Sequence, residues 1–170
     1  MWVVDTCVII DILEGDPSFG VASARCLTSY LSFGLVLAPV SYVELAPTFG
    51  GSKSRQEAFL NGVGIHYAEP WMQEDTLEAH RAWCRHQERK RAGLVKRRPV
   101  ADVLIGAYAQ RRHGLITRNE KDFRLLYPKL NVHVPLPILY GTERRTPGAR
   151  GCVCRWRARK RCGGKGGCPL

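Results

Sequence analysis

The stretch WVVDTCVIID, residues 2–11, indicates an α/β fold. Its first three residues are bulky and apolar, which is typical of a short buried strand. The chain turns at Asp5, and apolar residues then recur at helical spacing. An acid between a buried strand and a helix lies at the carboxyl edge of the strands, where open α/β sheets bind ligands. Asp5 could equally serve only as the N-cap of that helix, because Asp is a good capping residue.

Short apolar runs and helical patterns alternate along the rest of the chain. Further strands are predicted at residues 35–40, 65–68, 115–117 and 132–134. Further helices are predicted at residues 18–32, 41–46, 53–60, 71–91, 100–112 and 120–126. This alternation predicts a three-layer α/β/α sandwich with a central parallel sheet of about five strands.

The basic charge is concentrated in the last part of the chain. The net charge is +11, and residues 141–170 hold nine Lys or Arg and one acid. Residues 1–140 hold 17 Lys or Arg and 14 acids, so this part is only mildly basic. We interpret residues 1–140 as the folded domain. A basic protein suits a polyanionic partner, but charge alone does not indicate a reaction.

Residues 141–170 are rich in Gly, Arg and Cys and hold few aliphatic residues. We expect them to form a disordered basic tail that raises non-specific affinity for RNA. A zinc site at Cys152, Cys154, Cys162 and Cys168 is the alternative. Their spacing lacks the paired C-x₂-C pattern of zinc-binding motifs.

The sequence predicts a cytoplasmic protein. Met1 directly precedes the first predicted strand, so we expect no signal peptide. Prolines interrupt the longest apolar runs, so we expect no membrane span. The seven cysteines would then remain reduced.

Four acids follow strands or occupy the beginnings of helices. They are Asp5, Glu44, Asp102 and Asp122. In a parallel sheet these positions converge on one edge, and four carboxylates there would repel one another without a cation. Carboxylates without His or Cys suit Mg²⁺ or Mn²⁺, so the pattern predicts metal-assisted hydrolysis of a phosphodiester. Taken singly, each acid could instead be a surface acid or a favourable first-turn acid.

Four sequence blocks around these acids resemble the signature blocks of PIN-domain nucleases, most closely the VapC-type toxins of toxin–antitoxin pairs. The blocks are VDTCVIID at 4–11, PVSYVEL at 39–45, ADVLIGAYA at 101–109 and TRNEKDF at 117–123. The resemblance covers residues 1–138, with the blocks in the family's order. It implies a PIN-like fold, Mg²⁺- or Mn²⁺-dependent endoribonuclease activity, inhibition by a small antitoxin protein, and a homodimer.

The resemblance also implies roles for individual residues. Asp5, Glu44, Asp102 and Asp122 match the family's acidic quartet, and Thr6 and Asn119 match supporting polar residues. We expect Asp5 and Asp102 to ligate the metal directly and Asp122 to complete its shell. Glu44 would ligate a second ion or orient the attacking water. Cys7 is a departure, since the family often has Ser or Asn there.

Three arginines are candidates for contacts with RNA phosphates: Arg97, Arg98 and Arg118. Solvated surface arginines are the alternative for each. The whole domain could also be a catalytically silent PIN-like module that binds RNA or a protein. Dehalogenase-like phosphotransferases need a second acid where Cys7 stands, and response-regulator receivers need an acid pair beside Asp5, so both are excluded.

Overall fold

The computed structural model describes residues 1–95 and 99–137 of the 170-residue chain. A five-stranded sheet lies at the centre of this part, and all its neighbouring strands pair in parallel. The strands are β1 Trp2–Val4, β2 Leu35–Leu37, β3 Ile65–His66, β4 Gly114–Ile116 and β5 Val132–His133. Their order across the sheet is β3-β2-β1-β4-β5. The prediction of a parallel α/β sheet is therefore confirmed.

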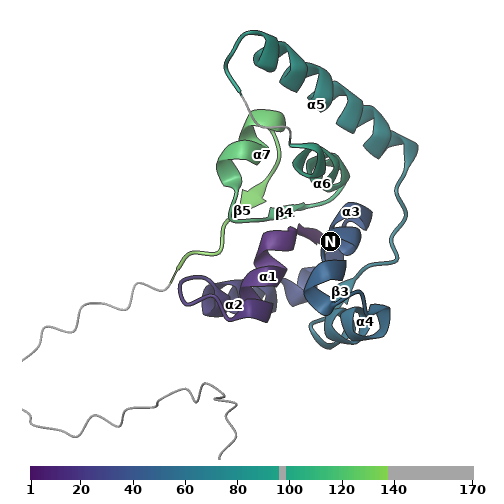
Figure 1. Ribbon diagram of the computed structural model, residues 1–170, viewed down its shortest axis with the longest axis vertical. Coiled ribbons are helices and arrows are strands. Elements are labelled where there is room, and N and C mark those ends of the chain that lie inside the picture. Colours follow the sequence, from purple (N-terminus) through teal and green to yellow (C-terminus); the bar gives the residue numbers. More distant parts are fainter. Residues whose placement is uncertain (96–98, 138–170) are drawn as a thin grey trace, which may run out of the picture. The chain divides into compact units, whose positions relative to one another are not determined.

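Helices cover both faces of the sheet, which confirms the three-layer prediction (Figure 1). The helices of the first face are α1 Thr6–Glu14, α2 Gly20–Tyr30 and α4 Lys53–Gly62. The second face is covered by α6 Val100–Gln110 and α7 Glu120–Leu126, and α5 Gln73–Arg91 packs outside these two. The short α3, Pro39–Glu44, contacts both α1 and α6.

The alternation of side chains along β1 divides the interior into two cores. Val3 belongs to the core under α6 and α7, together with its paired neighbours Val36 and Leu115. Trp2 and Val4 belong to the core under α1, α2 and α4. Successive residues of a strand point to opposite faces, so three residues of β1 suffice to join both cores.

The central strands end level with one another. Val4 pairs with Leu37 of β2 and with Ile116 of β4, so Asp5 and Thr117 follow side by side at the carboxyl edge. The chain leaves β1 for β2 on one side and later returns to β4 on the other. A strand order that reverses in this way opens a crevice at the carboxyl ends of the two strands, where such sheets bind ligands.

At the other end of β1, Trp2 pairs with Gly114. A Cβ atom added to Gly114 would lie 2.6 Å from the ring of Trp2 and 2.4 Å from the carbonyl oxygen of Asn131. The pairing of β1 with β4 at this end therefore requires a residue without a side chain.

The largest difference from the sequence prediction lies between β2 and α3. The prediction extends the strand to residue 40, but β2 ends at Leu37 and the helix begins at Pro39. Proline suits a first helical position because its fixed φ is helical and it lacks an N–H group. Glu44 is consequently the last residue of α3, whereas we expected it near the beginning. The other elements differ from their predicted bounds by at most two residues at each end.

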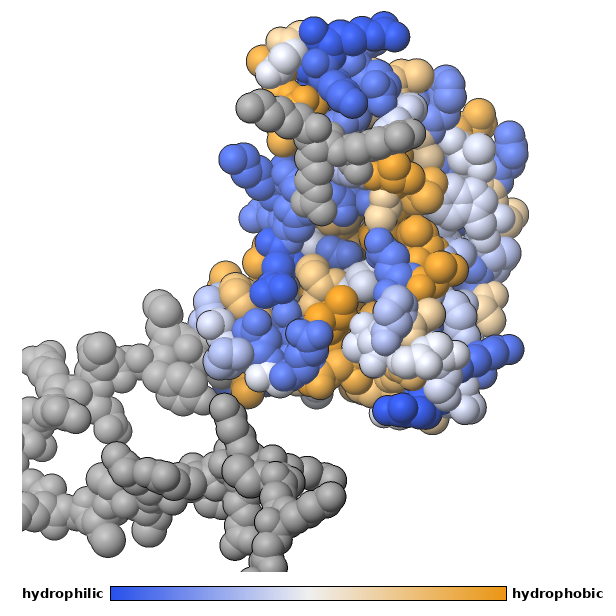
Figure 2. Space-filling model, in the orientation of Figure 1, coloured by the Kyte–Doolittle hydropathy of each residue, from blue (hydrophilic) through white to orange (hydrophobic). Residues whose placement is uncertain are grey.

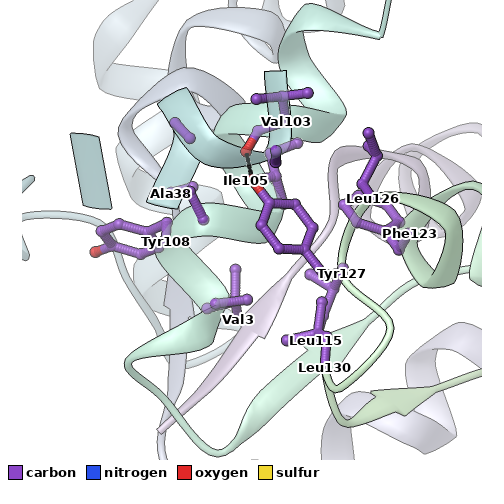
Figure 3. Close-up of a cluster of buried hydrophobic side chains, with 14 of the residues drawn as sticks. Val3, Ala38, Val103, Ile105, Tyr108, Leu115, Phe123, Leu126, Tyr127 and Leu130 are labelled. Atoms are coloured by element: carbon purple, nitrogen blue, oxygen red, sulfur yellow. Dashed lines mark hydrogen bonds between the residues drawn. The ribbon is translucent and has the colours of Figure 1, made fainter. Parts of the chain in front are cut away.

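Tyr127, which follows α7, packs against α6 in the core under α6 and α7 (Figure 3). Its hydroxyl donates to the carbonyl oxygen of Val103 at 2.5 Å, and burial raises the pKa of this hydroxyl. Its ring lies against Gly106, where an added Cβ would be only 2.2 Å from a ring carbon. Gly106 thus allows α6 and Tyr127 to pack closely.

Within residues 1–95 and 99–137, no helix combines the length and apolar character needed to cross a bilayer. Hydrophilic side chains cover the C-terminal end of α5 (Figure 2), whose last turn holds Arg89, Lys90 and Arg91. Arg97 and Arg98 lie outside the described residues. So does the basic tail with its four cysteines.

Candidate active site

Asp5 lies directly after β1 at the carboxyl edge of the sheet, and only 6% of it is exposed. It occupies the N-cap position of α1, but its side chain makes no capping hydrogen bond. Its Oδ2 instead accepts hydrogen bonds from the hydroxyl of Thr117 at 2.5 Å and the thiol of Cys7 at 3.2 Å. The carboxylate therefore lies at the carboxyl edge between β1 and β4, where Thr117 after β4 and Cys7 of α1 hold it.

Thr117 is the residue that sequence reasoning missed. It is completely buried after β4, and its Oγ1 accepts the backbone N–H of Asn119 at 2.9 Å while donating to Asp5. Asn119, which the resemblance implies as a supporting polar residue, contacts Thr117 through its backbone N–H. The signal in the sequence was a hydroxyl residue one position after a strand, at the edge that also holds Asp5.

Thr6 links Asp5 to the second predicted acid. The buried Thr6 hydroxyl donates to Oε2 of Glu44 at 2.7 Å. Glu44 is exposed at the end of α3, which lies beside α1 (Figure 1). The structure therefore places Glu44, at the end of its helix, against Thr6, the residue that follows Asp5.

The other two predicted acids lie in the first turns of helices on the second face. Asp102 lies in the first turn of α6 and Asp122 in the first turn of α7, and both are half-buried. Asp122 also lines a pocket with His86, Arg89 and Pro99. Within the described ranges, no three His, Cys, Asp or Glu side chains are grouped closely enough to hold a metal ion.

Burial dominates the electrostatics of the edge. It raises the pKa of the Asp5 carboxyl, against the effect of the hydrogen bonds from Thr117 and Cys7. Burial and the neighbouring Asp5 charge raise the pKa of the Cys7 thiol to about 12, so this thiol remains a donor at neutral pH. A cation beside Asp5 would favour its ionised form. Carboxylate and hydroxyl oxygens are also the donors that Mg²⁺ and Mn²⁺ prefer, so the chemistry of this edge fits such an ion.

Arg118 forms an ion pair within the protein. Its Nη2 lies 3.0 Å from Oδ1 of Asp11, an α1 residue that is only 2% exposed. Oδ2 of Asp11 accepts the hydroxyl of Ser23 at 2.9 Å. Burial raises the pKa of Asp11, and Ser23 and Arg118 oppose this change. Contact between Arg118 and RNA stays a prediction, since one third of its side chain remains exposed.

Comparison with known proteins adds one structural relationship. No family model and no curated protein matches the sequence. A chain of VapBC2 from Rickettsia felis, solved bound to a DNA fragment from their promoter, matches the structure with a TM-score of 0.58. The match covers 78% of this chain and 97% of that one. This chain has a PIN-like fold. The two sequences share 16% identity, so the PIN-like fold is what this similarity shows.

Proposed function

We propose that this chain is a Mg²⁺- or Mn²⁺-dependent endoribonuclease and the toxin of a toxin–antitoxin pair. The observation that carries the proposal is the buried Asp5 carboxylate at the carboxyl edge of a PIN-like sheet, next to Thr6, whose hydroxyl binds Glu44. A carboxylate in such a place is costly to desolvate unless it binds a ligand or a cation. The solved VapBC2 structure, which has the same fold, supports a toxin role with an antitoxin partner.

The proposed metal ligands are Asp5 and Asp102, with Asp122 completing the shell and Glu44 serving a second ion or the attacking water. A bound Mg²⁺ or Mn²⁺ would polarise the scissile phosphate and lower the pKa of the water that attacks it. Thr117 and Cys7 hold Oδ2 of the Asp5 carboxylate. Thr6 fixes the carboxylate of Glu44 beside it.

The substrate would be RNA. Arg97 and Arg98 are proposed to contact its phosphates. Arg118, the third arginine that the sequence predicts for this role, is paired with Asp11 and is left out of this proposal. A small antitoxin protein would inhibit the enzyme, and the active form would be a homodimer in the cytoplasm. RNA cleavage and growth arrest are separate readouts, so the chemistry and the biological role can be tested independently.

The chemistry is tested by incubating the purified chain with RNA in Mg²⁺, Mn²⁺ or EDTA. We expect cleavage only with metal. We expect Asp5→Asn to lower the rate at least about 100-fold, since losing even an outer partner of a metal ligand costs up to about that much. Glu120→Gln is the matched control, because this acid lies in the first turn of α7 beside Asp122 and pairs with Arg124. Metal-independent RNA binding without cleavage, unchanged in Asp5→Asn, would instead identify a silent binding module.

The toxin role is tested by expressing the chain in bacterial cells. We expect wild-type protein and Glu120→Gln to arrest growth and Asp5→Asn to permit it. Co-expression of a small protein encoded next to the gene should restore growth and co-purify with the chain. Normal growth with soluble, cleavage-competent wild-type protein would contradict the toxin role while leaving the ribonuclease activity standing.

A further inference from the structure

The loop of residues 117–119 places a buried hydroxyl against Asp5. Thr117 continues the pairing of β4 with β5, since its backbone N–H donates to the carbonyl oxygen of His133 at 3.0 Å. Its hydroxyl then contacts Asp5 and the backbone of Asn119. The position of this loop relative to α1 therefore decides whether the Asp5 carboxylate is held.

Arg118 connects the same loop to α1 at a second point. Its guanidinium pairs with Asp11 and lies 4.7 Å from the centre of the Phe19 ring. Both partners follow Asp5 in sequence, on α1 and on the segment that leads into α2. Consecutive residues of one loop thus bind α1 at its beginning, through Thr117, and near its end, through Arg118.

Asp11 is itself fixed on several sides. Its carboxylate accepts the Ser23 hydroxyl from α2, and its backbone carbonyl accepts the N–H of Asp16 at 2.9 Å. A buried ion pair contributes little net stability because desolvation offsets the attraction, but removing one partner leaves an uncompensated charge. The pair is therefore better suited to fixing the loop than to stabilising the fold.

We propose that Asp11 and Arg118 are positioning residues that hold Thr117 against Asp5, and that Arg118 acts in this way and not by contacting RNA. The inference rests on the proposed function for its catalytic consequence. The claim that Asp11 and Arg118 hold the loop can be tested in metal-free protein. This claim and the proposed function can therefore fail separately. Asp11 is not one of the four predicted acids, and its contact with the loop of residues 117–119 is made through Arg118.

The test compares Asp11→Asn, Arg118→Gln and the double variant with Asp75→Asn in the full chain. Asp75 is a matched control, because it is also buried and pairs with an arginine, Arg111, that is one third exposed. The first readout is hydrogen exchange at the Asn119 amide in metal-free protein. We expect exchange to rise about tenfold in each single variant and no further in the double variant, with no change in Asp75→Asn.

The second readout is Mn²⁺ affinity by calorimetry and the third is the kinetics of RNA cleavage. We expect Mn²⁺ affinity to fall about tenfold in Asp11→Asn and in Arg118→Gln, in line with the loss of an outer-shell partner of a metal ligand. In the same two variants we expect kcat for RNA cleavage to fall while KM for RNA stays constant. Arg118→Lys, which keeps the charge opposite Asp11, should recover part of each loss and covers the case in which Arg118→Gln fails to fold.

Unchanged exchange at the Asn119 amide in Asp11→Asn and Arg118→Gln would overturn the inference, and Asp11→Asn alone decides this if Arg118→Gln fails to fold. So would a rise in KM for RNA in Arg118→Gln with no effect of Asp11→Asn, because Arg118 would then contact the substrate. Wild-type protein that neither binds Mn²⁺ nor cleaves RNA would overturn the proposed function. The exchange measurement would still decide whether Asp11 and Arg118 hold the loop.

Discussion

Two buried aspartates pair with arginines on either side of β4, and their surroundings differ. Arg118 follows the carboxyl end of β4 and pairs with Asp11. Arg111 precedes its amino end and pairs with Asp75 of α5. In both pairs the aspartate is nearly inaccessible and the arginine side chain is 33% exposed.

The pKa values of the two aspartates shift in opposite directions. Asp75 accepts two hydrogen bonds from Arg111, at 2.6 and 2.8 Å, and one from the backbone N–H of Met72. Burial raises its pKa, but these hydrogen bonds outweigh burial and the net pKa is lowered. Asp11 accepts one hydrogen bond from Ser23 and lies 3.0 Å from Arg118, and these do not offset burial, so its pKa is raised. Asp75 also has Arg112 nearby, whereas the charges of Asp16 and Asp5 add to the rise at Asp11, so the donors and the neighbouring charges together set the two directions.

The largest expected effect is a difference in the free energy of unfolding between the variants that remove Asp75 and Asp11. Asp75→Asn removes a well-stabilised charge and leaves Arg111 without it, so we expect the free energy of unfolding to fall by about 3 kcal/mol. Asp11→Asn removes a charge that burial disfavours, so we expect a loss of about 1 kcal/mol. Urea unfolding of both variants measures this difference. Equal losses would show that the geometry of the two pairs does not govern their energies.

A smaller effect is expected when each arginine becomes lysine. Arg111→Lys loses the paired hydrogen bonds that only a guanidinium can make to one carboxylate, which should cost about 1.5 kcal/mol of unfolding free energy. Arg118→Lys keeps a single contact of the kind already present and should cost less than about 1 kcal/mol. Thermal unfolding monitored by circular dichroism distinguishes the two. A larger loss in Arg118→Lys would reverse the ranking.

The pairs should also respond oppositely to acid. The lowered pKa of Asp75 means that the native state binds fewer protons there than the unfolded state, so its contribution to stability is lost as the pH falls below about 4. The raised pKa of Asp11 means that its contribution increases as the pH falls toward about 4. The stability difference between wild type and Asp75→Asn should therefore shrink on acidification. The difference between wild type and Asp11→Asn should grow, and parallel changes would contradict both assignments.

Much of the fold could be predicted from the sequence because its patterns are local. Apolar runs and helical periodicity located β1, α7 and the parallel three-layer arrangement. The boundary between β2 and α3 was wrong, since an apolar run through Pro39 does not reveal where the backbone turns helical. Local periodicity also contains no information about the order of strands across the sheet.

The candidate site was predictable only in part. The convergence of strand ends predicts that Glu44 lies near Asp5, and in the structure Glu44 binds Thr6, the next residue. The hydrogen bond between Asp5 and Thr117 spans 112 positions and depends on which strands pair. The ion pair of Arg118 with Asp11 depends on the direction of a side chain in a loop, which no spacing rule gives. Both interactions arise from tertiary packing.

The pairing of Trp2 with Gly114 has a consequence at the far end of the same two strands. A one-residue slip of β1 against β4 would set the indole beside a residue that has a side chain, and would turn Val3 toward the wrong core. It would also carry Asp5 past the Thr117 hydroxyl. Gly114, at the opposite end of β4 from Thr117, thus helps to set the register that brings Asp5 to the Thr117 hydroxyl.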